Sequence, residues 1–165
     1  MADVDIDVVD GLGMDQTVRF DRREFPHAIR ATSVSQMVIT IISHLGPNRL
    51  RRLRIIGHAS AGLQGVADSR TTMDPNRLIQ VDSSGTLLNA TILCLLAASF
   101  APDGFVELHG CDVARGYAGK MLLTQLSALW RVRVRGGIGD QDNRPGFEHQ
   151  ARTATPVPGG GMTWQ

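Results

Sequence analysis

Hydrophobic and polar positions alternate in several short segments of this 165-residue chain. Residues 4–9, VDIDVV, place aliphatic and acidic side chains by turns, which is the two-residue period of a half-buried strand. The segment TVRF, residues 17–20, is predicted to pair with this strand. Further strands are predicted at 50–56 (LRRLRII), 105–109, 132–136 and near 147–153.

Between these strands, apolar residues recur at three- and four-residue spacing, which predicts helices. A first helix is expected to start after an N-cap at Thr32 or Ser33 and to end near Leu45. The next predicted helix is apolar on nearly all sides, so we expect it to be buried. This helix is placed at 84–100, and a further helix at 117–129. A hairpin-like excursion is expected at 63–82.

Helices and strands alternate along the chain, and this order predicts a mostly parallel sheet flanked by helices. The sequence contains no internal repeat, low-complexity tract or linker, so residues 1–165 are expected to form one α/β domain. In sheets of this kind, ligands and catalytic groups gather beyond the carboxyl ends of the strands. Reactive side chains that directly follow strands are therefore the first candidates for a site.

Two of the predicted strands end in such side chains. RIIGHASAG carries His58, and ELHGCDVARG carries Cys111 about 50 residues later. A cysteine is a nucleophile as the thiolate, and a neighbouring histidine can take its proton. The start of the helix predicted after Cys111 would favour the same anion. If the two strands are parallel neighbours, His58 and Cys111 face one cleft as a catalytic dyad.

The motifs GHASAG and LHGCDVARG resemble those of the caspase-like (clan CD) cysteine peptidase superfamily. Within it, LHGCDVARGYAGKML is most similar to a bacterial domain with His-Gly and Tyr-Gly-Cys-x-Val-Ala motifs, related to the self-cleaving peptidase domains of toxins. The terminal GGGMTWQ is similar to the Gly-rich ending of that domain. The resemblance covers about residues 33–165. It implies a caspase-like three-layer sandwich and a catalytic role for His58 and Cys111.

The resemblance also implies how substrate would be bound. Backbone N–H groups at Ala59 and Cys111 would hold the oxyanion, although the family usually has glycine at the position of Ala59. Metacaspase-like members carry an aspartate two residues before the cysteine, which binds a basic substrate side chain. This chain has His109 there, so no preference for Arg or Lys at the cleavage site is expected.

These observations predict a cysteine endopeptidase that cleaves a protein or peptide substrate, or itself, and needs no cofactor. Candidates for the substrate pocket are His109, Asp112 and Asp140, and Asp112 is also placed to cap the helix that follows it. Two other classes remain open: a catalytically inactive caspase-like interaction domain and a flavodoxin-like protein that binds a small ligand.

Charge and composition indicate which partners and which cellular compartment to expect for this protein. The formal net charge is +1, which gives no electrostatic reason to expect nucleic acid or a membrane as partner. Cys94 is expected in the core, and with no further cysteine pair the sequence predicts no metal site. The acidic start of the chain lacks the features of a signal peptide, which favours the cytoplasm. Arg131, Arg133 and Arg135 alternate with valines, as on a solvated strand face.

Overall fold

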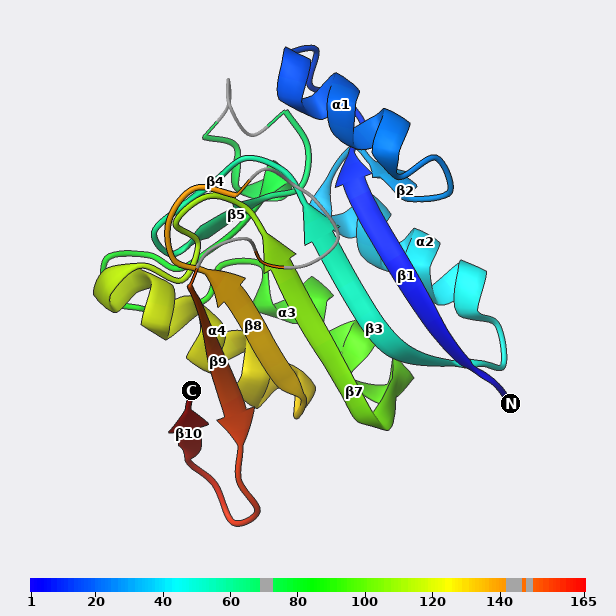
Figure 1. The fold of residues 1–165 in the computed structure, drawn as a ribbon. Coiled ribbons are helices and arrows are strands. Elements are labelled where there is room, and N and C mark those ends of the chain that lie inside the picture. The colour runs from blue at the N-terminus through cyan, green and yellow to red at the C-terminus, as the bar shows by residue number, and fades with distance from the viewer. Residues whose placement is uncertain (69–72, 142–146, 148–149) are drawn as a thin grey trace.

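The computed structural model describes residues 1–68, 73–141, 147 and 150–165 (Figure 1). It contains a seven-stranded sheet in the order β10-β9-β8-β7-β3-β1-β2, in which all pairs are parallel except β8-β9 and β9-β10. The predicted α/β class with a mostly parallel central sheet is therefore confirmed. The strands are β1 (Asp3–Asp10), β2 (Ile29–Ala31), β3 (Arg49–Ile56), β7 (Phe100–His109), β8 (Arg133–Gly137), β9 (Ala151–Pro156) and β10 (Met162–Trp164).

A smaller antiparallel sheet joins β4 (Ala59–Ser60), β5 (Leu63–Gly65) and β6 (Leu78–Gln80), beyond the carboxyl end of β3. It occupies the segment expected to be a hairpin-like excursion. A short 3-10 turn, η1 (Pro75–Arg77), precedes β6, and the Asp74 carboxylate caps this turn by accepting from the N–H of Asn76.

One face of the large sheet is covered by α2 (Val34–Leu45), α3 (Ala90–Leu93), the 3-10 helix η2 (Cys94–Ser99) and α4 (Gly116–Trp130), which lie behind it in Figure 1. The Ser33 hydroxyl accepts from the N–H of Gln36 and so caps α2, as predicted. Apolar side chains on this face of each strand point at the helices because strand residues alternate between faces. The fully buried core there includes Val8, Met37, Ile41, Leu53, Leu108, Leu122 and Trp130.

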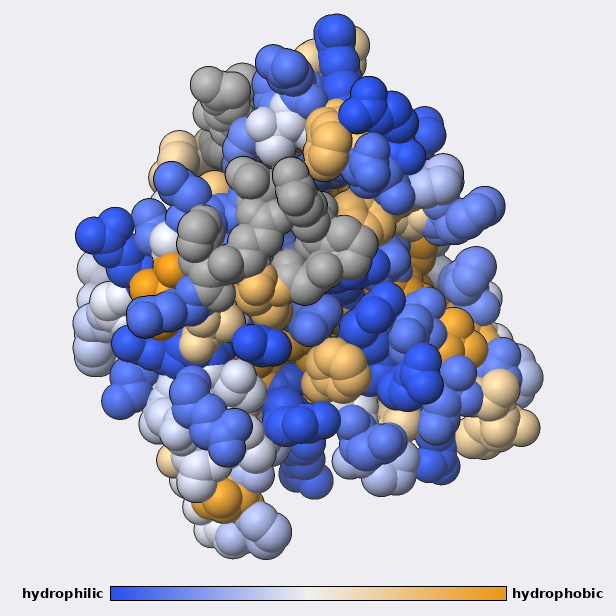
Figure 2. Space-filling view, viewed as in Figure 1, coloured by the Kyte–Doolittle hydropathy of each residue, from blue (hydrophilic) through white to orange (hydrophobic). Residues whose placement is uncertain are grey.

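The opposite face carries charged side chains. Near the carboxyl ends of the strands it holds a small apolar cluster of Val9, Ile56 and Phe25, the last being the C-cap of α1 (Gln16–Glu24). Among the described residues, no helix crosses in front of β7 and β8 below this cluster (Figure 1). Figure 2 views this same face, and many hydrophilic side chains lie on it below and to the right of the residues drawn in grey. We call it the charged face.

Opposite charges lie next to one another across the strands of the charged face. In one cross-strand row Asp7 is the register partner of Arg54, Arg54 of Glu107, and Glu107 of Arg135. The Arg54 guanidinium donates to both carboxylate oxygens of Asp7, at 2.9 and 2.8 Å, and it stacks over the Phe25 ring. The Arg54–Asp7 pair satisfies two charged groups on a sheet face that, in an all-parallel sheet, would usually be apolar and covered by helices.

The segment 17–20 is not a strand, so this prediction is wrong. It belongs to α1, because the Asp15 carboxylate accepts from the N–H groups of Thr17 and Val18 and so starts a helix. The strand that pairs with β1 on this side is β2 instead.

The single helix predicted over 84–100 is also wrong, because helical backbone covers only Ala90–Ser99. Residues 82–86 form a turn in which the Asp82 carboxylate accepts from two backbone N–H groups, and Asn89 takes the left-handed conformation before α3. Phe100 already begins β7. In the predicted strand 147–153, regular pairing starts at Ala151, and residues 148–149 lie outside the described residues.

In the described parts of the chain, no helix combines the length and the apolar character that crossing a membrane requires.

The charged face generates a prediction about acid stability. The interaction with the His109 ring, whose Nε2 lies 3.5 Å from Glu107 Oε2, holds the pKa of Glu107 below its usual 4.5; burial raises it, and Arg52 and Arg54 lower it further. Because this pKa is depressed on folding, the stabilisation is present above 4.5 and is lost as the pH falls through the folded pKa.

Glu107→Gln keeps the shape but not the charge, so it should lower the free energy of unfolding by about 1 kcal/mol at neutral pH. In strong acid the variant and the parent protein should be equally stable. Urea unfolding of both proteins across a pH series measures this difference. A difference that persists unchanged in strong acid, below the depressed pKa of Glu107, would contradict the assignment.

Candidate active site

The candidate site lies where β3 and β7 end side by side. These strands are parallel neighbours in a register that pairs Ile56 with His109, and the N–H of Gly57 donates to the carbonyl of His109 at 3.2 Å. The predicted adjacency of the two strands is therefore confirmed. His58 follows β3 and Cys111 follows β7, each two residues beyond this last paired position, at the same edge of the sheet.

Gly110 allows the two loops to approach closely. A Cβ atom on Gly110 would lie 2.2 Å from the Cβ of Ala59 and 2.8 Å from the carbonyl oxygen of Gly57. Real Cβ atoms do not come this near other atoms, so no larger residue fits without moving the loop that carries His58. Ala59 itself is outside the left-handed region, and its methyl group causes no backbone strain there.

Asp15 contacts His58, a partner for the histidine that sequence reasoning missed. Asp15 Oδ2 lies 3.0 Å from His58 Nε2, while Oδ1 accepts the two N–H groups that begin α1. Burial raises the pKa of Asp15, but hydrogen bonds from His58 and from the backbone of Val18 and Thr17 outweigh it, and the net effect lowers this pKa below 3.8. The sequence signals only that Asp15 can begin a helix; its contact with His58 comes from the tertiary structure.

The buried carboxylate of Asp10 fixes the loop that carries Asp15. Its Oδ1 accepts from the N–H groups of Leu12 and Gly13, both at 2.8 Å, and its Oδ2 accepts from the N–H of Asp68 at 2.6 Å. Asp10 is 1% exposed. It thereby joins the β1–α1 loop to the segment after β5, and both segments border the loop of His58.

Cys111 is half-buried, and its sulfur lies against the backbone of Gln141. The N–H of Gln141 donates to Sγ at 3.4 Å, and the carbonyl oxygen of the same residue is 3.8 Å from Sγ. These two contacts hold the sulfur against the loop after β8. Cys111 does not lie at the helix start that the sequence predicts, because α4 begins only at Gly116, after a turn.

Asp112 does not cap α4, whose N-cap is Arg115. Instead it connects the turn after Cys111 to the loop after β8. Its carboxylate accepts from the N–H of Gly139 at 2.9 Å, its own N–H donates to the carbonyl of Gly139 at 2.9 Å, and its backbone is left-handed with φ 58°. A role for Asp112 in binding substrate stays a prediction.

The other pocket candidates lie in different surroundings. His109 is 1% exposed, and its ring stacks on Phe147 with centroids 4.4 Å apart, so the imidazole packs on the charged face. Asp140 is exposed in the loop after β8, next to Gln141. Contact of either residue with substrate stays a prediction.

The expectation that Cys94 lies in the core is wrong. Its side chain is exposed, and the thiol donates to the carbonyl of Thr91 at 3.1 Å. η2 is a 3-10 helix, which has three residues per turn, so its side chains point in other directions than those of the predicted α-helix. As a result Cys94 and Leu95 are exposed and Leu96 is buried.

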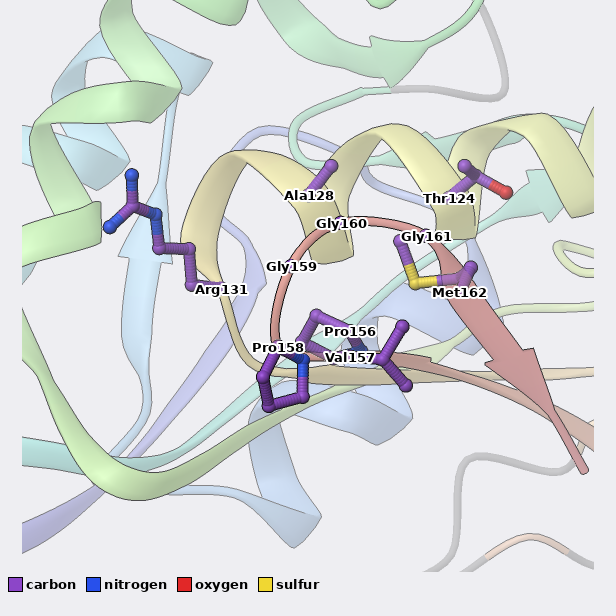
Figure 3. Close-up of a pocket in the computed structure, with 10 residues that line it drawn as sticks. All are labelled: Thr124, Ala128, Arg131, Pro156, Val157, Pro158, Gly159, Gly160, Gly161 and Met162. Atoms are coloured by element: carbon purple, nitrogen blue, oxygen red, sulfur yellow. The ribbon is translucent and has the colours of Figure 1, made fainter.

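A groove of about 750 Å³ lies away from these residues, between the last turns of α4 and the β9–β10 turn (Figure 3). Because β9 runs antiparallel to β8, this turn is at the end of the sheet opposite Cys111. Small and apolar residues line the groove, among them Ala128, Val157 and Met162, and the Arg131 side chain points away from it. Arg131 is the left-handed C-cap of α4 and not part of a strand, which corrects the predicted alternation.

Among the described residues, no group of three or more His, Cys, Asp or Glu side chains is placed to hold a metal ion. Comparisons of the chain with protein-family models, with curated proteins and with solved structures find no match. The class that the structure defines is an α/β protein with a mostly parallel seven-stranded sheet.

The close approach at Gly110 predicts the effect of adding one methyl group. Gly110→Ala should lower the free energy of unfolding by about 1–3 kcal/mol, because the new Cβ overlaps Ala59 and the Gly57 carbonyl. Urea unfolding measures this loss. The double variant Gly110→Ala/Ala59→Gly, which removes the nearest contact but not the second, should recover part of it. A fully stable single variant would show that the loops do not require glycine.

Proposed function

We propose that this protein is a cysteine endopeptidase of the caspase-like class, with Cys111 as nucleophile and His58 as general acid and base. The observation that carries the proposal is the parallel pairing of β3 and β7, which brings the histidine loop and the cysteine loop to one edge of the sheet. The crevice beyond the carboxyl ends of the strands is where such sheets carry their chemistry. The caspase-like fold suggested by the motifs is part of this proposal; the described helices cover one face of the sheet, and only α1 lies at the edge of the other.

Asp15 supports the proposal because it can orient the histidine. A carboxylate that accepts from Nε2–H fixes one tautomer of His58 and leaves Nδ1 as the basic nitrogen. It also stabilises the imidazolium that forms when His58 takes the thiol proton. This is the nucleophile, base and orienting acid arrangement that activates cysteines in other enzymes.

The reaction would proceed in two stages. His58 takes the proton of Cys111, the thiolate attacks the carbonyl carbon of the peptide bond, and the backbone N–H groups of Cys111 and Ala59 bind the oxyanion. His58 then gives its proton to the leaving amine as the C–N bond breaks. In the second stage water, deprotonated by His58, releases the acyl group from sulfur and restores the thiol.

The protein substrate would displace part of what now contacts the thiol. Gln141 contacts Cys111 Sγ with both its N–H and its carbonyl group. A substrate carbonyl must reach the same sulfur, so the loop after β8 would move aside or become one wall of the substrate site. The same contact is the observation that favours the second candidate, an interaction domain with the same fold whose thiol does not react.

Alkylation of the two thiols separates these candidates. Cys94 is the more exposed cysteine, so it serves as an internal reference for an ordinary thiol. At pH ~6 less than ~1% of an ordinary thiol is present as thiolate. Pairing with His58 should increase the thiolate fraction of Cys111. Iodoacetamide should therefore label Cys111 well before Cys94. Mass spectrometry of the labelled peptides gives both rates in one sample.

His58→Ala should slow the labelling of Cys111 to the rate of Cys94, and the matched variant of an exposed histidine, His44→Ala, should leave it unchanged. Asp15→Asn keeps the helix cap but loses the charge, so it should give an intermediate rate. Slow labelling of both cysteines that does not respond to His58→Ala would leave the interaction domain as the function.

Cleavage of a peptide library tests the expected specificity. We expect no preference for Arg or Lys at the cleaved bond, because the position two residues before Cys111 holds His109, and the nearby Glu107 already interacts with that ring. Cys111→Ser and His58→Ala should abolish cleavage. Dominant cleavage after basic residues would mean that an acid such as Asp112 or Asp140 binds the substrate side chain.

A further inference from the structure

The charged face contains a shallow hollow of about 530 Å³ over β7, β8 and β9. Only every second residue of a strand points to this face. The side chains around the hollow therefore come from several neighbouring strands. Its lining includes Phe105, Glu107, Arg133, Arg135, Thr153 and Gln165. Thr153 is short, and this leaves room beside the longer arginines of β8.

Arg133 and Arg135 differ from the other arginines of this face. Arg54 is bound by Asp7 through two hydrogen bonds. Across the part of the chain that the structure describes, no carboxylate oxygen lies within ion-pair distance of Arg133 or Arg135. Both are exposed. Glu107 lines the same hollow, but its carboxylate interacts with the His109 ring. The hollow therefore holds two arginines and one carboxylate, and neither arginine has a direct ion pair among the described residues.

Both guanidinium groups are supported by aromatic rings. Arg133 Cζ lies 5.7 Å from the centroid of the Phe105 ring, and Arg135 Cζ lies 4.7 Å from that of Phe147. Stacking on a ring restricts the side chain and leaves the edge of the guanidinium, with its N–H groups, available to a ligand. A guanidinium held in this way favours carboxylate through paired hydrogen bonds.

The spacing of the two arginines defines the ligand further. They are two residues apart on one strand, which places them about 6.6–6.8 Å apart along the sheet. Side chains two residues apart in an extended peptide have the same spacing. We propose that this hollow docks an extended acidic segment of a protein partner, with carboxylates at alternate positions bound by Arg133 and Arg135.

The charge pattern favours an acidic peptide over nucleic acid. Asp5, Asp7 and Glu107 lie on the same face, and the whole chain has a formal net charge of only +1. A polyphosphate backbone would need a continuous basic stripe, which these carboxylates interrupt. A short segment with two carboxylates needs only the β8 end of the face. The docking goes beyond the proposed peptidase activity, because it uses none of its residues.

Fluorescence anisotropy of a short labelled peptide with glutamates at alternate positions tests the proposal. The protein carries Cys111→Ser, so cleavage cannot affect the result. We expect binding that weakens as salt rises, since the arginines are exposed. A peptide of the same composition with its glutamates in one block should bind at least tenfold more weakly, and a glutamine version should not bind. A single-stranded oligodeoxynucleotide serves as the competing class of ligand.

Arg133→Gln/Arg135→Gln should weaken binding of the alternating peptide at least tenfold. The matched control, Arg19→Gln/Arg30→Gln, removes the same charge from two exposed arginines elsewhere and should leave binding within twofold. Circular dichroism checks that all variants are folded. Equal weakening by both double variants, equal binding of the alternating and block peptides, or binding of the oligonucleotide alone would each overturn the proposal.

Discussion

The parallel pairing of β3 with β7 is the interaction on which the rest of the site depends. It sets the register in which Ile56 lies beside His109, and it therefore decides that the loops of His58 and Cys111 leave the sheet together. Gly110 makes the contact between those loops close, since a side chain there would strike Ala59. A shift of this register by one residue would turn every side chain of β7 to the opposite face and separate the loops.

Two aspartates near the carboxyl ends of the strands each stabilise a local turn and also contact a distant part of the chain. Asp15 starts α1 with one oxygen and contacts His58 with the other, so the helix and the histidine are positioned by one group. Asp10 gathers three backbone N–H groups from two segments in the same way. Such carboxylates are costly to bury alone, and the N–H groups that surround them repay this cost.

The charged face explains how one side of a parallel sheet tolerates solvent. Its acids and arginines lie opposite one another across β1 and β3, so burial of each charge is partly compensated by its neighbour. Towards β8 this compensation ends, and the arginines rest on phenylalanine rings instead. The same pattern that stabilises one half of the face leaves the other half able to bind an acidic ligand.

Periodicity in the sequence was enough to determine β1, α2, β3, α4 and the α/β class, because each of these elements buries one regular face. The motifs also pointed to His58 and Cys111, and strand adjacency followed from the alternation of elements. Periodicity failed at residues 17–20 and 84–100, where capping by Asp15 and the turn around Asp82 decided the backbone. The exposure of Cys94, the contact of Asp15 with His58 and the Gln141 contact with Cys111 were decided only by the tertiary structure. Each joins or separates residues far apart in the chain, and no local pattern of hydrophobic and polar positions encodes such a contact.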